Sequence, residues 1–146
     1  MTLVTRLGTA LLTTPLVAAV GLLPTSPAHA VPDRAGVDAG SGTTAMPDQV
    51  LRRGCHAYAY TYSLSPGTGD WIFESFLVDP DRQRVSSGVF SSDSDPNPGT
   101  ATFTFCRSVT RFGTFKIRGR LTTYDGYEEA SAWITPTFVR LHRWGG

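Results

Sequence analysis

Short segments of alternating apolar and polar residues recur after residue 50, and turn-forming residues separate them. The period of two is typical of β-strands with one buried face, and no window in this part of the chain has a helical period. Six strands are predicted in this way, at residues 55–62, 71–78, 84–90, 100–106, 113–124 and 130–141. A seventh strand is predicted only if residues 49–53 pair with a neighbour.

The segment 113–124 has the clearest alternation. Its apolar positions fall on one face and its cations on the other, as expected for a half-buried strand of an antiparallel sheet. The apolar positions are Phe115, Ile117 and Leu121, and the opposite face carries Lys116, Arg118, Arg120 and Thr122. In the last predicted strand Pro136 indicates a break, a bulge or an edge, because proline cannot donate a ladder hydrogen bond.

Glycine, proline, aspartate and serine residues separate the predicted strands, notably at 65–69, 79–81 and 91–99. Strands that recur about every 8–12 residues between such turns favour a β-sandwich over a βαβ fold. The predicted fold class is therefore all-β, an antiparallel β-sandwich of about six to seven strands.

Residues 1–30 have the features of a secretory signal peptide. Arg6 precedes an apolar run, and small residues at 28–30 suit a signal-peptidase site. A membrane anchor is the alternative, but the apolar run is short and interrupted by Pro15. We therefore expect cleavage after Ala30, a secreted protein, and no transmembrane segment in the mature chain.

The following segment, 31–50, contains no aromatic residue and no sustained period. Its composition predicts a flexible N-terminal linker, and a propeptide is the alternative that remains open. Every aromatic residue of the chain lies after this segment. The folded domain is accordingly predicted to span 51–146.

Charge excludes some partners and leaves one surface of interest. The chain has 13 basic and 12 acidic residues, so no global field favours nucleic acid, and none is expected as a partner. Residues 107–143 nevertheless carry seven cations against three acids. The row Lys116, Arg118 and Arg120 suggests a face for an anionic cell-envelope polymer or another secreted protein. The alternative is a solvated face that discourages edge pairing.

Two cysteines remain after export, Cys55 and Cys106. An even count in an oxidising compartment predicts a disulfide, worth about 4 kcal/mol for a loop of this length in the chain-entropy model. A reactive thiol is the alternative, but the sequence has no Cys-x-x-Cys pattern.

The order of Cys55, Trp71 and Cys106 along these strands resembles an immunoglobulin-like sandwich. The segments GTFKIRGRLTTYDG (113–126) and FVRLHR (138–143) resemble the last two strands of small secreted immunoglobulin-like or fibronectin-III-like domains of actinobacteria. The resemblance implies an immunoglobulin-like fold and no chemistry by itself. It departs from the family in having two predicted strands after Cys106, so the bridge is expected to join a different strand pair.

Few residues suggest chemistry. The mature chain has two histidines, and it contains neither a Gly-x-Ser-x-Gly nor a His-Glu-x-x-His motif. No catalytic residue, cofactor or zinc site is predicted, and we expect a protein that is not an enzyme. Asp93, Asp95 and Asn97 have the alternation of a calcium loop, but Pro98 stands where an EF-hand needs glycine. Solvated turn residues are the alternative for these three.

Three tyrosines share one face of the first predicted strand: Tyr58, Tyr60 and Tyr62. Exposed, they would form a ligand face that stacks on sugar rings. Buried, they would belong to the core, which is the more common use of alternating aromatic residues.

These observations support three hypotheses for the function. The first is a secreted, non-enzymatic binding or structural module that acts at the cell envelope or extracellularly. The second is a small inhibitor, toxin or ligand carrier that uses loop 65–70 or loop 91–99. The third, a carboxylate-dependent hydrolase, rests on Glu128 and Glu129 with a distant aspartate.

Overall fold

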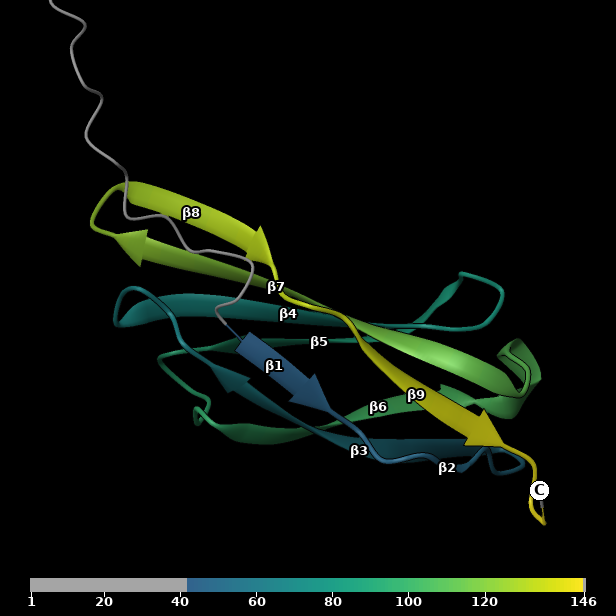
Figure 1. Cartoon of the computed structure of the whole chain (residues 1–146). Coiled ribbons are helices and arrows are strands. Elements are labelled where there is room, and N and C mark those ends of the chain that lie inside the picture. Colours follow the sequence, from purple (N-terminus) through teal and green to yellow (C-terminus); the bar gives the residue numbers. More distant parts are fainter. Residues whose placement is uncertain (1–41, 146) are drawn as a thin grey trace, which may run out of the picture. The chain divides into compact units, whose positions relative to one another are not determined.

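The computed structural model describes residues 42–145, which form two β-sheets packed face to face (Figure 1). The predicted signal peptide, 1–30, and residues 31–41 lie outside the described residues. The strands of the described part are β1 (Gly42–Ala45), β2 (Gln49–Val50), β3 (Cys55–Leu64), β4 (Asp70–Val78), β5 (Arg84–Ser91), β6 (Gly99–Cys106), β7 (Gly113–Asp125), β8 (Glu128–Trp133) and β9 (Thr137–His142). The single short 3-10 helix within 42–145, η1, spans Arg107–Val109.

The smaller sheet has the order β1-β3-β6, and the larger has the order β2-β9-β7-β4-β5 with β8 also paired to β7. Every pairing is antiparallel except that of β2 with β9. The first part of the long strand β7 pairs with β9 and its last part with β8. The all-β class and the antiparallel sandwich predicted from the two-residue period are confirmed.

The predicted last strand, 130–141, is divided in two around Pro136, so β8 and β9 pair with successive parts of β7. This division is the break that the proline predicts. It raises the number of strands above the expected six or seven.

The prediction of a flexible linker over 31–50 is wrong for its last nine residues. Residues 42–50 contain β1 and β2, and both Thr44 and Met46 are buried. The Thr44 hydroxyl donates to Thr137 Oγ1 at 2.8 Å, and Thr137 Oγ1 donates to the Thr44 carbonyl at 2.6 Å. Residues 42–45 are small and mostly polar, so they show no alternation of apolar and polar positions. The strand forms because it pairs with β3 in the folded protein.

The core between the sheets is rich in aromatic rings. Tyr60 stacks on Phe103 with ring centroids 4.1 Å apart, and both residues belong to the smaller sheet. Tyr62 reaches Phe73 of the larger sheet at 5.4 Å. Such pairs add about 0.5–1.5 kcal/mol each beyond the burial of their apolar area. The Tyr62–Phe73 pair in this way links the two sheets.

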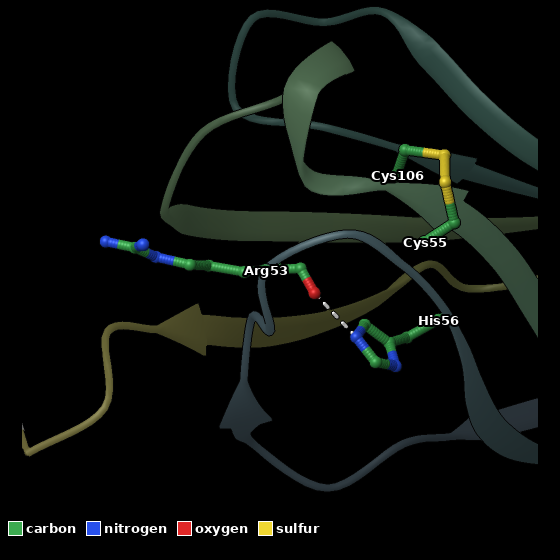
Figure 2. The surroundings of a disulfide bond; sticks show 4 residues. All are labelled: Arg53, Cys55, His56 and Cys106. Carbon is green, nitrogen blue, oxygen red and sulfur yellow. Dashed lines mark hydrogen bonds between the residues drawn. A yellow bond between two sulfur atoms is a disulfide. The ribbon is translucent and has the colours of Figure 1, made fainter.

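Cys55 and Cys106 form the predicted disulfide. They stand directly opposite one another on the antiparallel strands β3 and β6, so the bridge lies within one sheet. Figure 2 shows the bridge between these two neighbouring strands. The bridge of an antibody domain joins its two sheets instead. The expectation that this bridge joins a different pair of strands is therefore confirmed.

Candidate functional site

The three tyrosines of β3 belong to the core, so they do not form a ligand face. Tyr58, Tyr60 and Tyr62 are each only 2% exposed. The opposite face of β3, with Ala57, Ala59 and Thr61, is the one that meets solvent. Because the inward face of a strand is fixed by its register, the tyrosine rings cannot stack on a sugar outside the sandwich.

Each tyrosine hydroxyl has a partner inside the fold, as buried phenols require. Tyr58 Oη accepts from the backbone N–H of Arg52 at 3.1 Å, and Tyr62 Oη donates to the carbonyl of Pro96 at 3.0 Å. Tyr60 Oη lies 2.6 Å from Ser75 Oγ, and burial raises the pKa of Tyr60 to about 12. Burial also raises the pKa of Tyr62.

The three predicted cations of β7 lie on its outer side, as the alternation indicated. Arg118 and Arg120 are exposed, and Lys116 is half-buried. Arg120 forms an ion pair with Glu74, and its Nε donates to Glu74 Oε2 at 2.6 Å. Lys116 and Arg118 have no such carboxylate partner within residues 42–145.

Aromatic side chains take the place of carboxylates around these two cations. The Arg118 guanidinium carbon lies 4.1 Å from the Trp133 ring centroid, and Lys116 Nζ lies 5.3 Å from that of Phe138. On β5, the Arg84 guanidinium carbon lies 5.5 Å from the centroid of the Phe76 ring of β4. We call these six residues the aromatic–basic face: Phe76, Arg84, Lys116, Arg118, Trp133 and Phe138.

Cross-strand register brings the aromatic–basic face together. Phe76 of β4 stands opposite Arg118, and Phe138 of β9 stands opposite Lys116. Trp133 of β8 reaches Phe76 with ring centroids 6.0 Å apart. The sequence identified Lys116 and Arg118 but not their aromatic partners, because the pairing of β7 with β4, β8 and β9 cannot be inferred from local periodicity.

Five residues of the aromatic–basic face, all except Phe138, line an open depression of about 620 Å³ on the outside of the larger sheet. None of the described residues that line it is acidic. Trp133 is 44% exposed and Phe138 is 61% exposed, so two large rings meet solvent beside unneutralised cations. Exposed apolar area of this kind marks binding surfaces, and the adjacent charge favours an anionic ligand.

Two of the three candidate calcium ligands, which lie between β5 and β6, form hydrogen bonds to backbone groups of the protein. Asp95 Oδ2 accepts from the backbone N–H of Ser91 at 3.0 Å. The Asn97 amide bonds both the N–H and the carbonyl of Leu64, at 2.9 and 3.0 Å. Asp93 is exposed. Within 42–145 no three histidine, cysteine or acidic side chains are grouped so that they could hold a metal ion.

Loop 91–99 is anchored to the strands beside it. In addition to the Asn97 bonds, the Ser92 N–H donates to the Trp71 carbonyl at 3.0 Å, and Ser92 Oγ donates to Asp70 Oδ1 at 3.3 Å. The loop precedes β6, whereas the disulfide lies at the other end of that strand. Loop 65–70 meets this region through Asp70.

The residues considered for chemistry lie apart from one another. Glu128 and Glu129 are the first two residues of β8, and both are exposed. His56 donates from Nε2 to the Arg53 carbonyl at 2.7 Å when that nitrogen carries the proton, and His142 Nδ1 contacts the Arg143 carbonyl at 2.9 Å. Both histidines therefore bond backbone near the ends of strands.

Among residues 42–145, no helix has the length and apolar character that crossing a membrane requires. Comparisons of the whole chain with protein-family models and with curated proteins found no match.

Proposed function

We propose that this chain is a secreted, non-enzymatic, immunoglobulin-like module that binds a linear anionic polymer of the cell envelope through the aromatic–basic face. The observation that carries the proposal is the arrangement of three cations, each over an aromatic ring, on one open sheet face. The sequence features of residues 1–30 and the disulfide support export, because disulfides persist in oxidising compartments.

The geometry suits a polymer better than a small molecule. The depression is shallow and lies along neighbouring strands, whereas small-molecule sites are concave and enclose most of their ligand. Lys116 and Arg118 are two residues apart on β7, so their charges repeat at about 7 Å along the strand. A chain with regularly spaced negative groups matches such a row.

The aromatic rings add a contact that salt does not screen. Stacking over a ring also holds each cation in place, and such pairs contribute about 0.5–1 kcal/mol at exposed sites. A bound sugar ring can pack its apolar face on Trp133 or Phe138, both of which meet solvent. The proposed ligand therefore combines anionic groups with sugar rings or other apolar units.

The test measures binding of the disulfide-bonded chain to immobilised polymers at fixed ionic strength. We expect retention on polygalacturonate or on poly(glycerol phosphate), and none on neutral dextran. The two acidic polymers distinguish carboxylate from phosphate groups. The double variant Lys116→Ala/Arg118→Ala is expected to lose about 10-fold or more in affinity, equivalent to about 1.4 kcal/mol.

The matched control is Arg111→Ala combined with Arg140→Ala, which removes the same charge from exposed positions outside the aromatic–basic face. It should retain the affinity of the unchanged chain. Equal losses in both double variants would mean that net charge alone drives binding, and the proposal would then fail. Equal retention on dextran would contradict it as well.

A second candidate is a loop-based inhibitor, which the anchoring of loop 91–99 favours, since a fixed exposed loop binds with a smaller entropic cost. Asn97→Ala removes the anchor to Leu64 and leaves the aromatic–basic face intact. Loss of activity in an inhibition assay on a protease panel after Asn97→Ala, with polymer binding absent, would favour this candidate.

A further inference from the structure

A second cationic cavity lies at the end of the sandwich where β2 and β9 end, apart from the aromatic–basic face. Its volume is about 590 Å³. We call it the arginine pocket, and six of its lining residues define it: Arg52, Arg53, Arg107, Phe112, Arg143 and Trp144. They come from three separate parts of the chain, before β3, between β6 and β7, and after β9.

The arginine pocket has four guanidinium groups and no acid among the described residues that line it. The ion pairs found within 42–145 lie elsewhere, at Arg111–Asp81 and Arg120–Glu74. Like charges gathered in this way repel one another, and the repulsion falls when an anion enters. The positive charge of the lining residues therefore favours a negatively charged ligand.

Two of the arginines share one aromatic ring. The Arg107 guanidinium carbon lies 3.9 Å from the Phe112 centroid, and that of Arg143 lies 5.3 Å from the same centroid. Stacking of this kind leaves the edges of a guanidinium available to donate hydrogen bonds in its plane. Phe112 therefore positions the two groups without using their donors.

Arg107 also has an unsatisfied donor. Its Nε atom is buried and has no hydrogen-bond partner among the described residues. Buried donors without partners are rare in folded proteins, and an unseen ion is one recognised explanation. An oxyanion in the pocket would offer acceptors to the guanidinium of Arg107. The unpaired Nε atom is an observation separate from the excess of arginines over acids in the lining.

The walls of the pocket are held by the backbone. The Leu51 N–H donates to the His142 carbonyl at 2.9 Å, and the Arg107 N–H donates to the Gly54 carbonyl at 2.9 Å. The disulfide lies directly beside these last two contact points, since Cys55 follows Gly54 and Cys106 precedes Arg107. Figure 2 shows the Arg53 side chain extending away from the bridge while its carbonyl bonds His56.

We propose that the arginine pocket binds a compact oxyanion that carries more than one negative charge, either a phosphate-bearing group or clustered carboxylates. Guanidinium forks match both groups with paired hydrogen bonds. Trp144, which is 84% exposed, supplies a ring at the rim of the pocket. The proposal is independent of polymer binding at the aromatic–basic face.

The experiment titrates the disulfide-bonded chain with pyrophosphate and, separately, with citrate, at constant ionic strength in sodium chloride. Isothermal titration calorimetry gives the affinity, and tryptophan fluorescence reports the site. We expect saturable binding of at least one anion with one-to-one stoichiometry. The anion that binds more tightly identifies the group, phosphate or carboxylate. A fluorescence change is expected that disappears in Trp144→Phe.

Arg143→Gln and Arg107→Lys are expected to weaken this binding about 10-fold or more, as loss of a paired hydrogen bond to a charged group does. Arg143 is exposed, so its replacement leaves the fold intact even if Arg107→Lys does not. Arg118→Ala, on the aromatic–basic face, is the matched control and should bind unchanged. Failure of both anions to bind overturns the proposal, and so does an equal loss in Arg118→Ala.

Discussion

The Tyr60 hydroxyl lies 2.6 Å from the Ser75 hydroxyl, and this contact joins the smaller sheet to the larger one inside the core. Ser75 is fully buried, and Tyr60 stacks on Phe103 beside it. Burial raises the pKa of Tyr60 to about 12, because the tyrosinate would lose its hydration there. The core is therefore sensitive to alkaline pH.

Stability should fall between about pH 10 and pH 12. In this window the unfolded chain releases the Tyr60 proton while the folded chain keeps it, which costs about 1.4 kcal/mol per pH unit for one group. Urea unfolding at about pH 8 and pH 11 measures the effect. Tyr60→Phe should show a smaller alkaline loss, whereas Tyr127→Phe, at an exposed position, should keep the full loss.

Gly119 of β7 is predicted to tolerate no side chain. A Cβ at this position would lie 2.6 Å from Phe73 Cε2 and 2.8 Å from Ile134 Cδ1, inside normal contact distance. Gly119→Ala should destabilise the fold by about 1–3 kcal/mol, the usual cost of overpacking. Gly69→Ala meets nothing within 4 Å and should change thermal stability little. Equal melting temperatures for the two variants would contradict the packing shown here.

The disulfide closes a loop between residues 51 positions apart. Removing it in Cys55→Ala/Cys106→Ala should cost about 4 kcal/mol in guanidinium unfolding, chiefly by freeing the unfolded chain. The reduced form of the unchanged protein is the control and should match the variant. A loss of much less than half this value would indicate that the unfolded chain is already restricted around residues 55–106.

The dependence of polymer affinity on salt concentration should distinguish the contribution of the cations of the aromatic–basic face from that of its aromatic rings. Each cation that neutralises the polymer releases a counterion, so Arg118→Ala should lower the slope of log affinity against log salt by about one unit. Trp133→Ala should weaken binding with the slope nearly unchanged. Polymer retention at several sodium chloride concentrations gives both slopes. A change of slope in Trp133→Ala would show that the ring acts only by holding Arg118.

The sequence was most informative where strands alternate. The period-two pattern of 113–124 predicted both the buried side of β7 and the outward row with Lys116 and Arg118. It did not predict β1, whose residues are small and whose pairing depends on β3. It also left open which face of β3 is buried, because both faces carry apolar residues and only the second sheet decides between them.

The two cationic surfaces depend on pairings that no local pattern shows. Phe76 and Arg118 come together only because β4 pairs with β7 in one register. In the arginine pocket, Arg53 and Arg143 meet because β2 pairs with β9. The sequence alone therefore indicated an excess of cations, but it did not predict that they are divided between the aromatic–basic face and the arginine pocket.

The parallel pairing of β2 with β9 has a mechanical consequence. If the domain is pulled by the chain before β2 and after β9, the two strands are drawn in opposite directions along their lengths, so their hydrogen bonds are stretched together in shear. Residues 55–106 form a closed loop and cannot be drawn out while the disulfide is intact. Under tension this domain would therefore lengthen by only the part of its chain that lies outside residues 55–106.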